Sequence, residues 1–338
     1  MKIDHKSILL TGASGFAGSH MLKCLVENTD SYIYCPVTYN HGGHKKRIES
    51  IVPDIFKNRY TLLNHDLAIH KLGDTMFDSE IDMIINYASE SHVDRAIDTP
   101  GEFVSNNVNL MTNLLEFARK TKSHPKFIHI STDEVYGDLE ANVDNSEYLR
   151  PQLPSNPYSA SKSAQESLAI AYYKTYNMDI SIINSTNMLG EGQNQEKYIP
   201  KVIQYILNNK EINVDTDVMG NMGSRKYIYV GDVANAVLLI SKFDSYAKSK
   251  LPEKFHISGS QEISNYDIVR IISDILSITP KTIIAPSPRN GYDLRYELSS
   301  DKLLKLGWKE KIPIATRLTE IVNWTLAHPE WLKIDYNS

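Results

Sequence analysis

Residues 8–19 read ILLTGASGFAGS, an apolar run that passes through a glycine-rich turn into a helix-like segment. The glycines at Gly12, Gly15 and Gly18 have the spacing GxxGxxG. Between a strand and a helix, such glycines permit a tight turn, let backbone N–H groups approach a pyrophosphate, and allow close helix–strand packing. A glycine-rich turn without a ligand is the alternative, but the strand–turn–helix context favours a dinucleotide-binding unit.

Strand-like and helix-like segments alternate through the first half of the chain. Strands apolar on both faces and joined by crossover helices form parallel sheets that are covered on both sides. We therefore predict an α/β fold with a doubly wound, Rossmann-type parallel sheet, whose ligands bind at the carboxyl ends of the strands. The predicted strands are residues 7–10, 32–37, 60–64, 81–87, 127–131 and 180–184, and the predicted helices are 16–27, 44–51, 102–120 and 158–176.

After about residue 187 the loops lengthen and the strand-like runs become short. We assign residues 1–186 to an NAD(P)-binding Rossmann domain. Residues 187–225 and 251–338 are predicted to form a smaller C-terminal α/β lobe that binds substrate. Between them, 227–241 reads as a strand and then a helix, so the chain is expected to recross into the first domain at about 226–250.

The composition is ordinary for a protein with a sizeable core: 338 residues, 41% hydrophobic and 23% charged. The net charge of −5 argues against nucleic acid or a membrane surface as the main partner. Only two cysteines occur, and the apolar run at residues 8–10 is too short for a signal peptide or a membrane helix, so we expect a cytoplasmic protein. His41 and His44 lack further ligands, and no metal site is predicted.

The second predicted strand lacks the acidic residue that would bind a cofactor ribose. Cys35 and Pro36 occupy that place, and the basic run HKKR follows at residues 44–47. Without the acid, an NADP 2′-phosphate is not repelled, and the basic run could pair with it. The run could equally be a solvated start of a helix. NAD and NADP therefore remain equal candidates.

Tyr158 and Lys162 stand four residues apart in a predicted helix, which places the phenol and the ammonium on one face. A neighbouring cation lowers the pKa of a tyrosine, so Tyr158 could accept a proton from a sugar hydroxyl while a nicotinamide takes the hydride. The motif YxxxK is common by chance. Together with the upstream glycine motif, it indicates a short-chain dehydrogenase/reductase.

STDEVYG at residues 131–137 places Asp133 and Glu134 side by side where a strand leaves the core. A cap followed by a solvated loop would explain them structurally. At the carboxyl end of a strand in this fold, they are better explained as an acid and a base of different pKa that act on adjacent carbons.

Sequence blocks along most of the chain resemble those of the nucleotide-sugar 4,6-dehydratases, a branch of the extended short-chain dehydrogenase/reductase family. STDEVYG is the specific block, because related epimerases and decarboxylases share the glycine loop and YxxxK but usually lack the acid pair. The other blocks are TGASGFAGSH (11–20), ASESHVDRAI (88–97), PSNPYSASKSAQE (154–166), EKYIP (196–200), Arg225 with YVGD (229–232), and PRNGYDLRY (288–296).

The resemblance implies a reaction that converts an NDP-hexose, in the first instance NDP-glucose, to the NDP-4-keto-6-deoxy sugar plus water. Tyr158, with Lys162 and Thr132 beside it, would take the proton from the 4-hydroxyl as hydride leaves C4. Glu134 would then remove the C5 proton, and Asp133 would protonate the departing C6 hydroxyl. The hydride would return to C6, so NAD or NADP would stay tightly bound and be regenerated in each turnover.

The resemblance also implies binding residues and a homodimer formed through the helices near 102–120 and 158–176. The cofactor would contact Gly12, Ser14, Gly15, Phe16, Ala17, Gly18, Asp66, Leu67, Ala88, Ser89, Tyr158 and Lys162. The substrate would contact Ser91, Asn187, Lys197, Arg225 and Arg289, with the two arginines clamping the diphosphate.

Some positions depart from the family pattern, and they cluster around the nucleotide base and the cofactor ribose. TNMLGE stands at 186–191 in place of the family's SNNYGP, the loop at 215–224 is longer and has no aromatic residue, and Asn290 and Tyr292 replace a proline and a histidine. The acid–base set is intact. We infer that the reaction is kept while the nucleotide could have changed. A 4-epimerase or decarboxylase on the same scaffold, or a non-catalytic NAD(P)-binding protein, are the alternatives.

Overall fold

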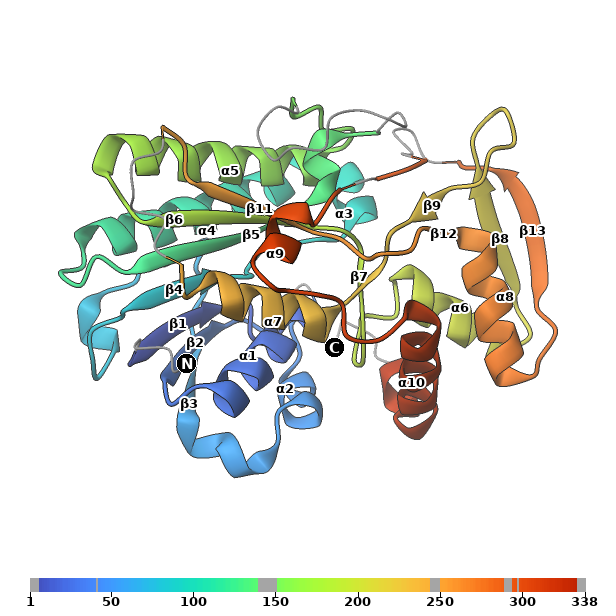
Figure 1. The fold of residues 1–338 in the computed structure, drawn as a ribbon, viewed down its shortest axis with the longest axis horizontal. Helices are drawn as coiled ribbons and strands as arrows, with labels where there is room; N and C mark the ends of the chain where they lie inside the picture. Colours follow the sequence, from blue (N-terminus) through green and yellow to red (C-terminus); the bar gives the residue numbers. More distant parts are fainter. Residues whose placement is uncertain are drawn as a thin grey trace.

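The computed structural model describes residues 6–40, 42–138, 151–243, 250–288, 294–296 and 298–332. Its centre is a seven-stranded sheet with the order β11-β6-β5-β4-β1-β2-β3, in which each neighbouring pair is parallel (Figure 1). The strands are β1 Ser7–Thr11, β2 Tyr32–Val37, β3 Tyr60–Asn64, β4 Met83–Asn86, β5 Lys126–Thr132, β6 Ile180–Ser185 and β11 Glu253–Ile257. This confirms the predicted doubly wound fold.

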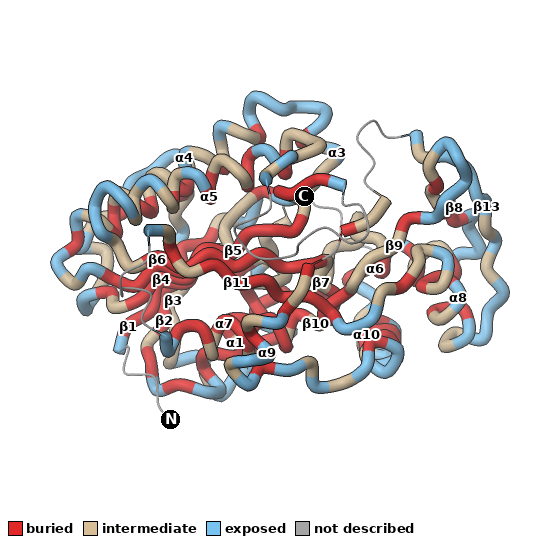
Figure 2. Tube along the Cα trace, turned by 45° about the horizontal axis from the view of Figure 1, so that its top comes forward, coloured by how far each residue is buried: buried red, intermediate tan, exposed pale blue. Residues whose placement is uncertain are grey.

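Helices cover both faces of the sheet. Successive strand residues point to opposite sides, and since both sets are apolar, both faces need to be buried. Ile8 and Leu10 pack into a core with α1 (Phe16–Asn28), α2 (Lys45–Ile51) and α7 (Val230–Ile240), whereas Leu9 joins the other core with α4 (Pro100–Lys120) and α5 (Pro157–Tyr176). Figure 2 shows the resulting pattern: the strands at the centre of the sheet are buried, whereas the outer helices, the loops and the strand at residues 281–286 are largely exposed. The predicted helices and strands of the first half agree with these bounds to within two residues.

One strand that we assigned to the smaller lobe lies in the central sheet. β11 pairs with β6 in parallel, from Glu253 opposite Ser181 to Ile257 opposite Ser185. The bounds predicted for the two lobes remain a prediction, but residues 253–257 belong to the main sheet. The recrossing of the chain at about 226–250 likewise stays a prediction, and α7, which lies in that range, packs against α1.

The remaining elements form a second packing unit beside the sheet (Figure 1). Here β8 (Glu211–Thr216) pairs in parallel with β13 (Lys281–Pro286), and a separate hydrophobic core joins α6 (Tyr198–Leu207), α8 (Asn265–Leu276) and α10 (Ile314–Ala327). The short elements are α3 Val93–Asp98, β7 Met188–Leu189, β9 Ser224–Arg225, β10 Ile228–Tyr229, β12 Ile263–Ser264, α9 Asp301–Lys305 and the 3-10 turns Asp54–Arg59, Asp74–Met76, Asp133–Tyr136 and Pro329–Leu332.

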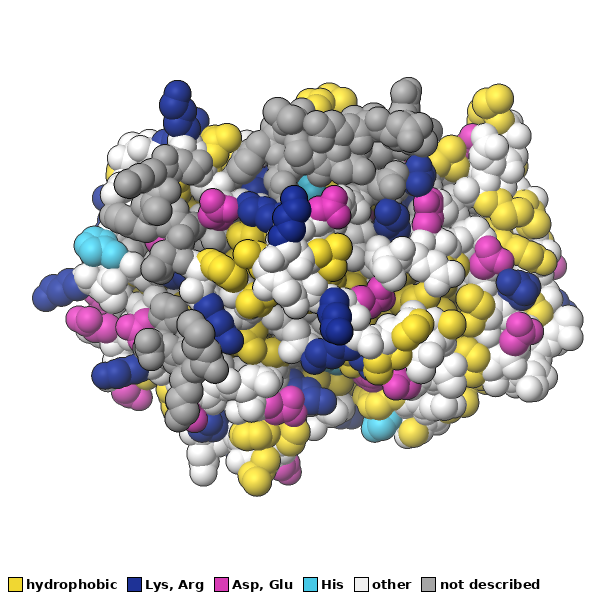
Figure 3. All heavy atoms as spheres, viewed as in Figure 1, with side chains coloured by type: hydrophobic (Ala, Val, Ile, Leu, Met, Phe, Trp, Pro, Cys, Tyr) yellow, Lys and Arg dark blue, Asp and Glu magenta, His cyan; other side chains and the backbone are white. Residues whose placement is uncertain are grey.

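The face seen in Figure 3 carries lysine and arginine side chains interspersed with aspartate and glutamate, not a patch of one sign. Among the described residues, no helix combines the length and the apolar character that crossing a membrane would require.

Candidate active site

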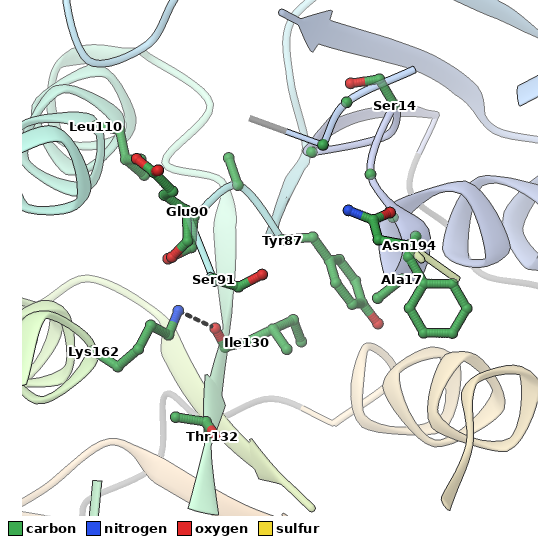
Figure 4. A pocket seen from close by; sticks show the side chains of 18 of the residues that line it. Ser14, Ala17, Tyr87, Glu90, Ser91, Leu110, Ile130, Thr132, Lys162 and Asn194 are labelled. Atoms are coloured by element: carbon green, nitrogen blue, oxygen red, sulfur yellow. Dashed lines mark hydrogen bonds between the residues drawn. The ribbon is translucent and has the colours of Figure 1, made fainter. Parts of the chain in front are cut away.

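A cavity of about 350 Å³ opens at the carboxyl ends of the central strands. It is lined by the residues that directly follow or end β1 through β6, which is where a doubly wound sheet binds ligands. The predicted site residues that line it are Gly12, Ser14, Gly15, Phe16, Ala17, Gly18, Asp66, Leu67, Ala88, Ser89, Ser91, Thr132, Asp133, Glu134, Tyr158, Lys162, Asn187 and Lys197. Figure 4 labels Ser14, Ala17, Ser91, Thr132 and Lys162 among them.

The glycine loop leaves bare backbone at the floor of this cavity. Gly12 has φ +72°, and a Cβ there would stand 2.8 Å from the backbone of Tyr87 and Ala88. A Cβ on Gly18 would lie 2.1 Å from the Gly12 carbonyl oxygen, so the start of α1 packs directly on the turn. Only glycine fits both positions, and the geometry suits a pyrophosphate bound at the N-terminus of α1.

The end of β2 presents no carboxylate to the cavity. Cys35 is fully buried in the hydrophobic core, whereas Pro36, Val37 and Thr38 line the cavity. Burial also raises the pKa of the Cys35 thiol. Cys35 therefore offers no group to a cofactor ribose.

The basic run that follows β2 is not a uniformly solvated helix start. Lys45 and Lys46 are exposed, and His44 caps α2 by accepting from the Lys46 N–H. Arg47 is fully buried, and its guanidinium donates to the backbone carbonyls of Ser14 and Gly42. This engagement with the backbone differs from both alternatives left open for the run, a pairing with a 2′-phosphate and a solvated start of a helix.

Asp133 and Glu134 form the first residues of the 3-10 turn that follows β5. Thr132 caps this turn: its hydroxyl accepts from the Glu134 N–H at 3.3 Å and donates to Asp133 Oδ1 at 3.0 Å. Asp133 is buried, whereas Glu134 is partly accessible. Burial, reinforced by the negative charge of Glu134, raises the pKa of Asp133 to about 7. The Asp133 carboxyl group therefore keeps its proton to a higher pH than an ordinary aspartate does.

Tyr158 and Lys162 lie in the first two turns of α5. Asn156 and Ser159 cap this helix reciprocally, and Pro157 lies in its first turn. Both side chains reach residues of β5, Tyr158 the hydroxyl of Thr132 and Lys162 the carbonyl of Ile130. Lys162 Nζ donates to the Ile130 carbonyl and to Gln165 Oε1, each at 2.8 Å (Figure 4). Burial lowers the pKa of Lys162 to about 7.

The pKa of Tyr158 is shifted in the direction opposite to our expectation. Burial raises it, and the nearby charges of Glu134 and Asp133 raise it further, while a hydrogen bond with Thr132 works in the opposite direction. The ammonium of Lys162 donates to the Ile130 carbonyl and to Gln165. Thr132 does lie beside the phenol, as predicted.

Three of the five predicted substrate contacts line the cavity: Ser91, Asn187 and Lys197. Lys197 Nζ reaches across to the Ser91 carbonyl at 2.9 Å. Arg225 does not line it. Its guanidinium donates to the carbonyls of Ser224 and Leu294 and stacks over the Tyr296 ring at 4.5 Å, although its charge is near enough to oppose the rise in the pKa of Asp133. Arg289 lies outside the described residues.

Sequence reasoning missed Glu90, an almost fully buried residue that lines the cavity. Its carboxylate contacts Arg95 at 2.7 Å, and its backbone N–H donates to Asn107. The signal was present, since Glu90 lies inside ASESHVDRAI, the block from which only Ser91 had been selected as a substrate contact.

Glu166 was also missed as a support of the site. Its carboxylate is fully buried and accepts from Ser131 Oγ, Asn184 Nδ2 and Lys254 Nζ at 2.5–2.8 Å. These partners come from β5, β6 and β11, so one side chain of α5 binds three strands of the sheet. Within the described part of the chain, no group of three or more His, Cys, Asp or Glu residues is arranged so that it could hold a metal ion.

Comparison with known sequences shows which family this chain belongs to. The family model described as GDP-mannose 4,6 dehydratase matches residues 9–321. A dTDP-glucose 4,6-dehydratase of Escherichia coli is 32% identical, and the alignment covers 96% of this chain and 94% of that protein. A trifunctional UDP-glucose 4,6-dehydratase, epimerase and reductase of Arabidopsis thaliana is 33% identical over 96% of this chain. The chain spans about half the length of that plant relative, 48%.

Solved structures agree with the assignment. The DesIV dTDP-glucose 4,6-dehydratase of Streptomyces venezuelae, with NAD bound, has a TM-score of 0.80 at 26% identity and covers 96% of this chain and 98% of its own. A UDP-glucuronic acid 4-epimerase of Bacillus cereus has a TM-score of 0.83 at 22% identity, with 95% and 99% covered, which shows a shared fold. The match over residues 9–321, together with the acid pair, the tyrosine and the glycine loop in one cavity, shows that this chain belongs to the GDP-mannose 4,6 dehydratase family of nucleotide-sugar dehydratases.

Proposed function

We propose that this chain is an NAD(P)-dependent nucleotide-sugar 4,6-dehydratase, which converts an NDP-hexose to the NDP-4-keto-6-deoxy sugar plus water. One observation carries the proposal: Asp133, Glu134 and Tyr158 line the same cavity as the glycine loop. A hexose held there can meet two carboxyl groups and a phenol while a dinucleotide lies on the backbone of α1.

The cavity fits a nicotinamide dinucleotide, because the glycine loop at the N-terminus of α1 would accept its pyrophosphate and Tyr158 lines the same cavity. When bound, the nicotinamide ring would take a hydride from C4 of the sugar and return it to C6. The chain's own residues handle the protons. Tyr158 would receive the proton of the 4-hydroxyl, and a bound cationic ring would favour the phenolate that burial now disfavours.

The acid pair would carry out the loss of water. Glu134, the more accessible carboxylate, would remove the C5 proton once C4 is a ketone. Asp133 holds a proton at neutral pH far better than an ordinary carboxyl group, so it would protonate the departing C6 hydroxyl. Thr132 would place the two carboxyl groups in different surroundings, since its hydroxyl donates to the Asp133 side chain and accepts from the backbone N–H of Glu134.

For the cofactor we favour NAD over NADP. Arg47 is committed to backbone carbonyls and so does not extend toward a 2′-phosphate. Two dehydratase structures at 26% identity, from Streptomyces venezuelae and Bacillus anthracis, hold NAD. We also expect a homodimer that packs through α4 and α5, and a reducing cytoplasm, in keeping with the buried free thiols Cys24 and Cys35.

The test is to incubate the protein with dTDP-, UDP-, CDP- and GDP-hexoses in deuterated water and to analyse the products by mass spectrometry and NMR. Loss of water with solvent deuterium at C5 is the expected result. Inversion at C4 without water loss would identify an epimerase instead, and no turnover of any sugar would favour a binding protein.

The variant Glu134→Gln checks the assignment of the base. Water loss should fall by a factor of about 10²–10⁴, the usual contribution of a positioned acid or base. Glu80→Gln, at an exposed glutamate that does not line the cavity, is the matched control. Wild-type turnover by Glu134→Gln would show that another group removes the C5 proton.

A further inference from the structure

Arg47 joins three segments that line one end of the cavity. Its Nη1 donates to the Ser14 carbonyl at 2.7 Å and to the Gly42 carbonyl at 2.6 Å. Its Nε donates to the Gly192 carbonyl at 2.9 Å, and its Nη2 donates to the Asn194 side chain. One guanidinium thus connects the glycine loop, the connection between β2 and α2, and the loop at residues 190–197 that precedes α6.

Two of these segments, the connection between β2 and α2 and the loop at residues 190–197, contact each other at this end of the cavity. A Cβ added to Gly42 would lie 2.5 Å from Asn194 Nδ2, so the backbone at Gly42 is in close contact with that side chain. Gly42, Asn194 and Ser14 all line the cavity, and Figure 4 shows the Asn194 side chain at the same end as Ser14. The contact lies next to the glycine loop, where the pyrophosphate of a dinucleotide would be.

The backbone at these two segments is shaped to face the guanidinium. Gly42 has φ +93° and Gly192 has φ +68°, conformations that favour glycine and turn their carbonyl groups toward Arg47. Trp331, from the 3-10 turn after α10, covers the guanidinium at 4.9 Å and is itself buried. The hydrogen bonds to the Ser14 and Gly192 carbonyls are therefore buried, and those to Gly42 and Asn194 are partly buried.

We propose that Arg47 is a positioning residue that latches the 190–197 loop onto the Gly42 segment and thereby controls how fast the cofactor enters and leaves. The inference rests on the proposed function, because it requires a dinucleotide in the cavity. In the latched arrangement the adenosine and pyrophosphate half is enclosed between the two segments. Passage of the cofactor in either direction requires the bonds from Arg47 to Gly192 and Asn194 to break.

A latch slows both entry and exit, and this separates it from a purely structural role. Loosening a binding site raises only the dissociation rate, whereas opening a latch raises the association rate as well. The reaction would benefit, because a cofactor that is regenerated in each turnover has no need to exchange.

The test measures association and dissociation of radiolabelled NAD⁺ and NADP⁺ by rapid filtration for the full-length protein. Arg47→Lys retains a positive charge but lacks the fork that reaches four acceptors. Asn194→Ala removes one acceptor and gives a second, milder opening of the latch. Arg59→Lys is the matched control, since Arg59 also donates to backbone carbonyls, those of Thr29 and Ser31, and does not line the cavity.

Both association and dissociation should be at least tenfold faster in Arg47→Lys, and severalfold faster in Asn194→Ala. Arg59→Lys should stay within twofold of wild type for both rates. Faster dissociation with unchanged association, or unchanged rates in both variants, would overturn the latch. Failure of the wild-type protein to bind either dinucleotide would instead refute the proposed function on which the latch rests.

Discussion

Replacing Asp133 with asparagine should make the protein more stable while removing its proposed acid. The pKa of Asp133 rises from its ordinary 3.8 to about 7 because the carboxyl group is buried beside Glu134. The folded protein therefore keeps a proton that the unfolded chain gives up near pH 4. Stability that is present below pH 4 is lost as the pH rises through about 7.

The size of the effect follows from the shift. A difference of about three pKa units, at about 1.4 kcal/mol for each unit, amounts to about 4 kcal/mol above pH 7. Asparagine does not titrate, and it retains an oxygen that can accept from Thr132 as Asp133 Oδ1 does. The free energy of unfolding of Asp133→Asn should match that of wild type near pH 4 and exceed it by up to about 4 kcal/mol at pH 8.

Urea denaturation at pH 4.5, 6 and 8, followed by circular dichroism, measures this difference. Asp217→Asn is a control of opposite sign, because Asp217 accepts from the Met219 and Asn221 N–H groups and its pKa is lowered. That control should lose stability at pH 8. The reasoning is wrong if Asp133→Asn is no more stable than wild type at pH 8, or if its advantage does not depend on pH.

Three further predictions concern the support of the site. Lys254→Met leaves the Glu166 carboxylate buried without its cation and should lower the free energy of unfolding, measured by urea denaturation, by about 3–5 kcal/mol. Adding Glu166→Gln should restore at least half of that loss. If it restores none, the two side chains are not coupled. Gly18→Ala places a Cβ 2.1 Å from the Gly12 carbonyl oxygen and should abolish NAD⁺ binding in equilibrium dialysis, so wild-type affinity would contradict the packing of the turn. Tyr158→Phe should lower turnover about 10²–10⁴-fold at saturating substrate, and a smaller loss would assign proton transfer to another group.

The sequence predicted the sheet best where the signal is local. β1, β2 and β3 combine apolar runs with glycine or polar ends, and their bounds agree with the prediction to within one residue. β11 was placed wrongly because pairing with β6 is a contact between distant segments. A five-residue strand carries no sign of which sheet it joins.

The sequence indicated which residues would line the cavity, but not the direction of the Tyr158 pKa shift or the hydrogen-bond partners of Lys162. The four-residue spacing brought Tyr158 and Lys162 to one helix face, yet the ammonium binds the Ile130 carbonyl, and a backbone acceptor has no signature in the sequence. Arg47 was misread for the same reason: a basic run usually indicates solvent, and its acceptors are carbonyls from three separate loops. Arg225 stacks over Tyr296 where Ser224 pairs with Arg295, and the sequence does not show which distant segments pair.

The late arrival of β11 has a consequence for biosynthesis. Lys254 follows Glu166 by 88 residues, and a ribosome that adds about 5–20 residues per second needs several seconds to make that stretch. Throughout this time the Glu166 carboxylate would be buried without its cation if α5 docked, which makes docking of α5 onto β5 and β6 less favourable than in the finished chain. We expect α5 to reach its full stability on the sheet only when β11 is complete. A translation product that stops before residue 254 would then carry both catalytic motifs with α5 less stably docked.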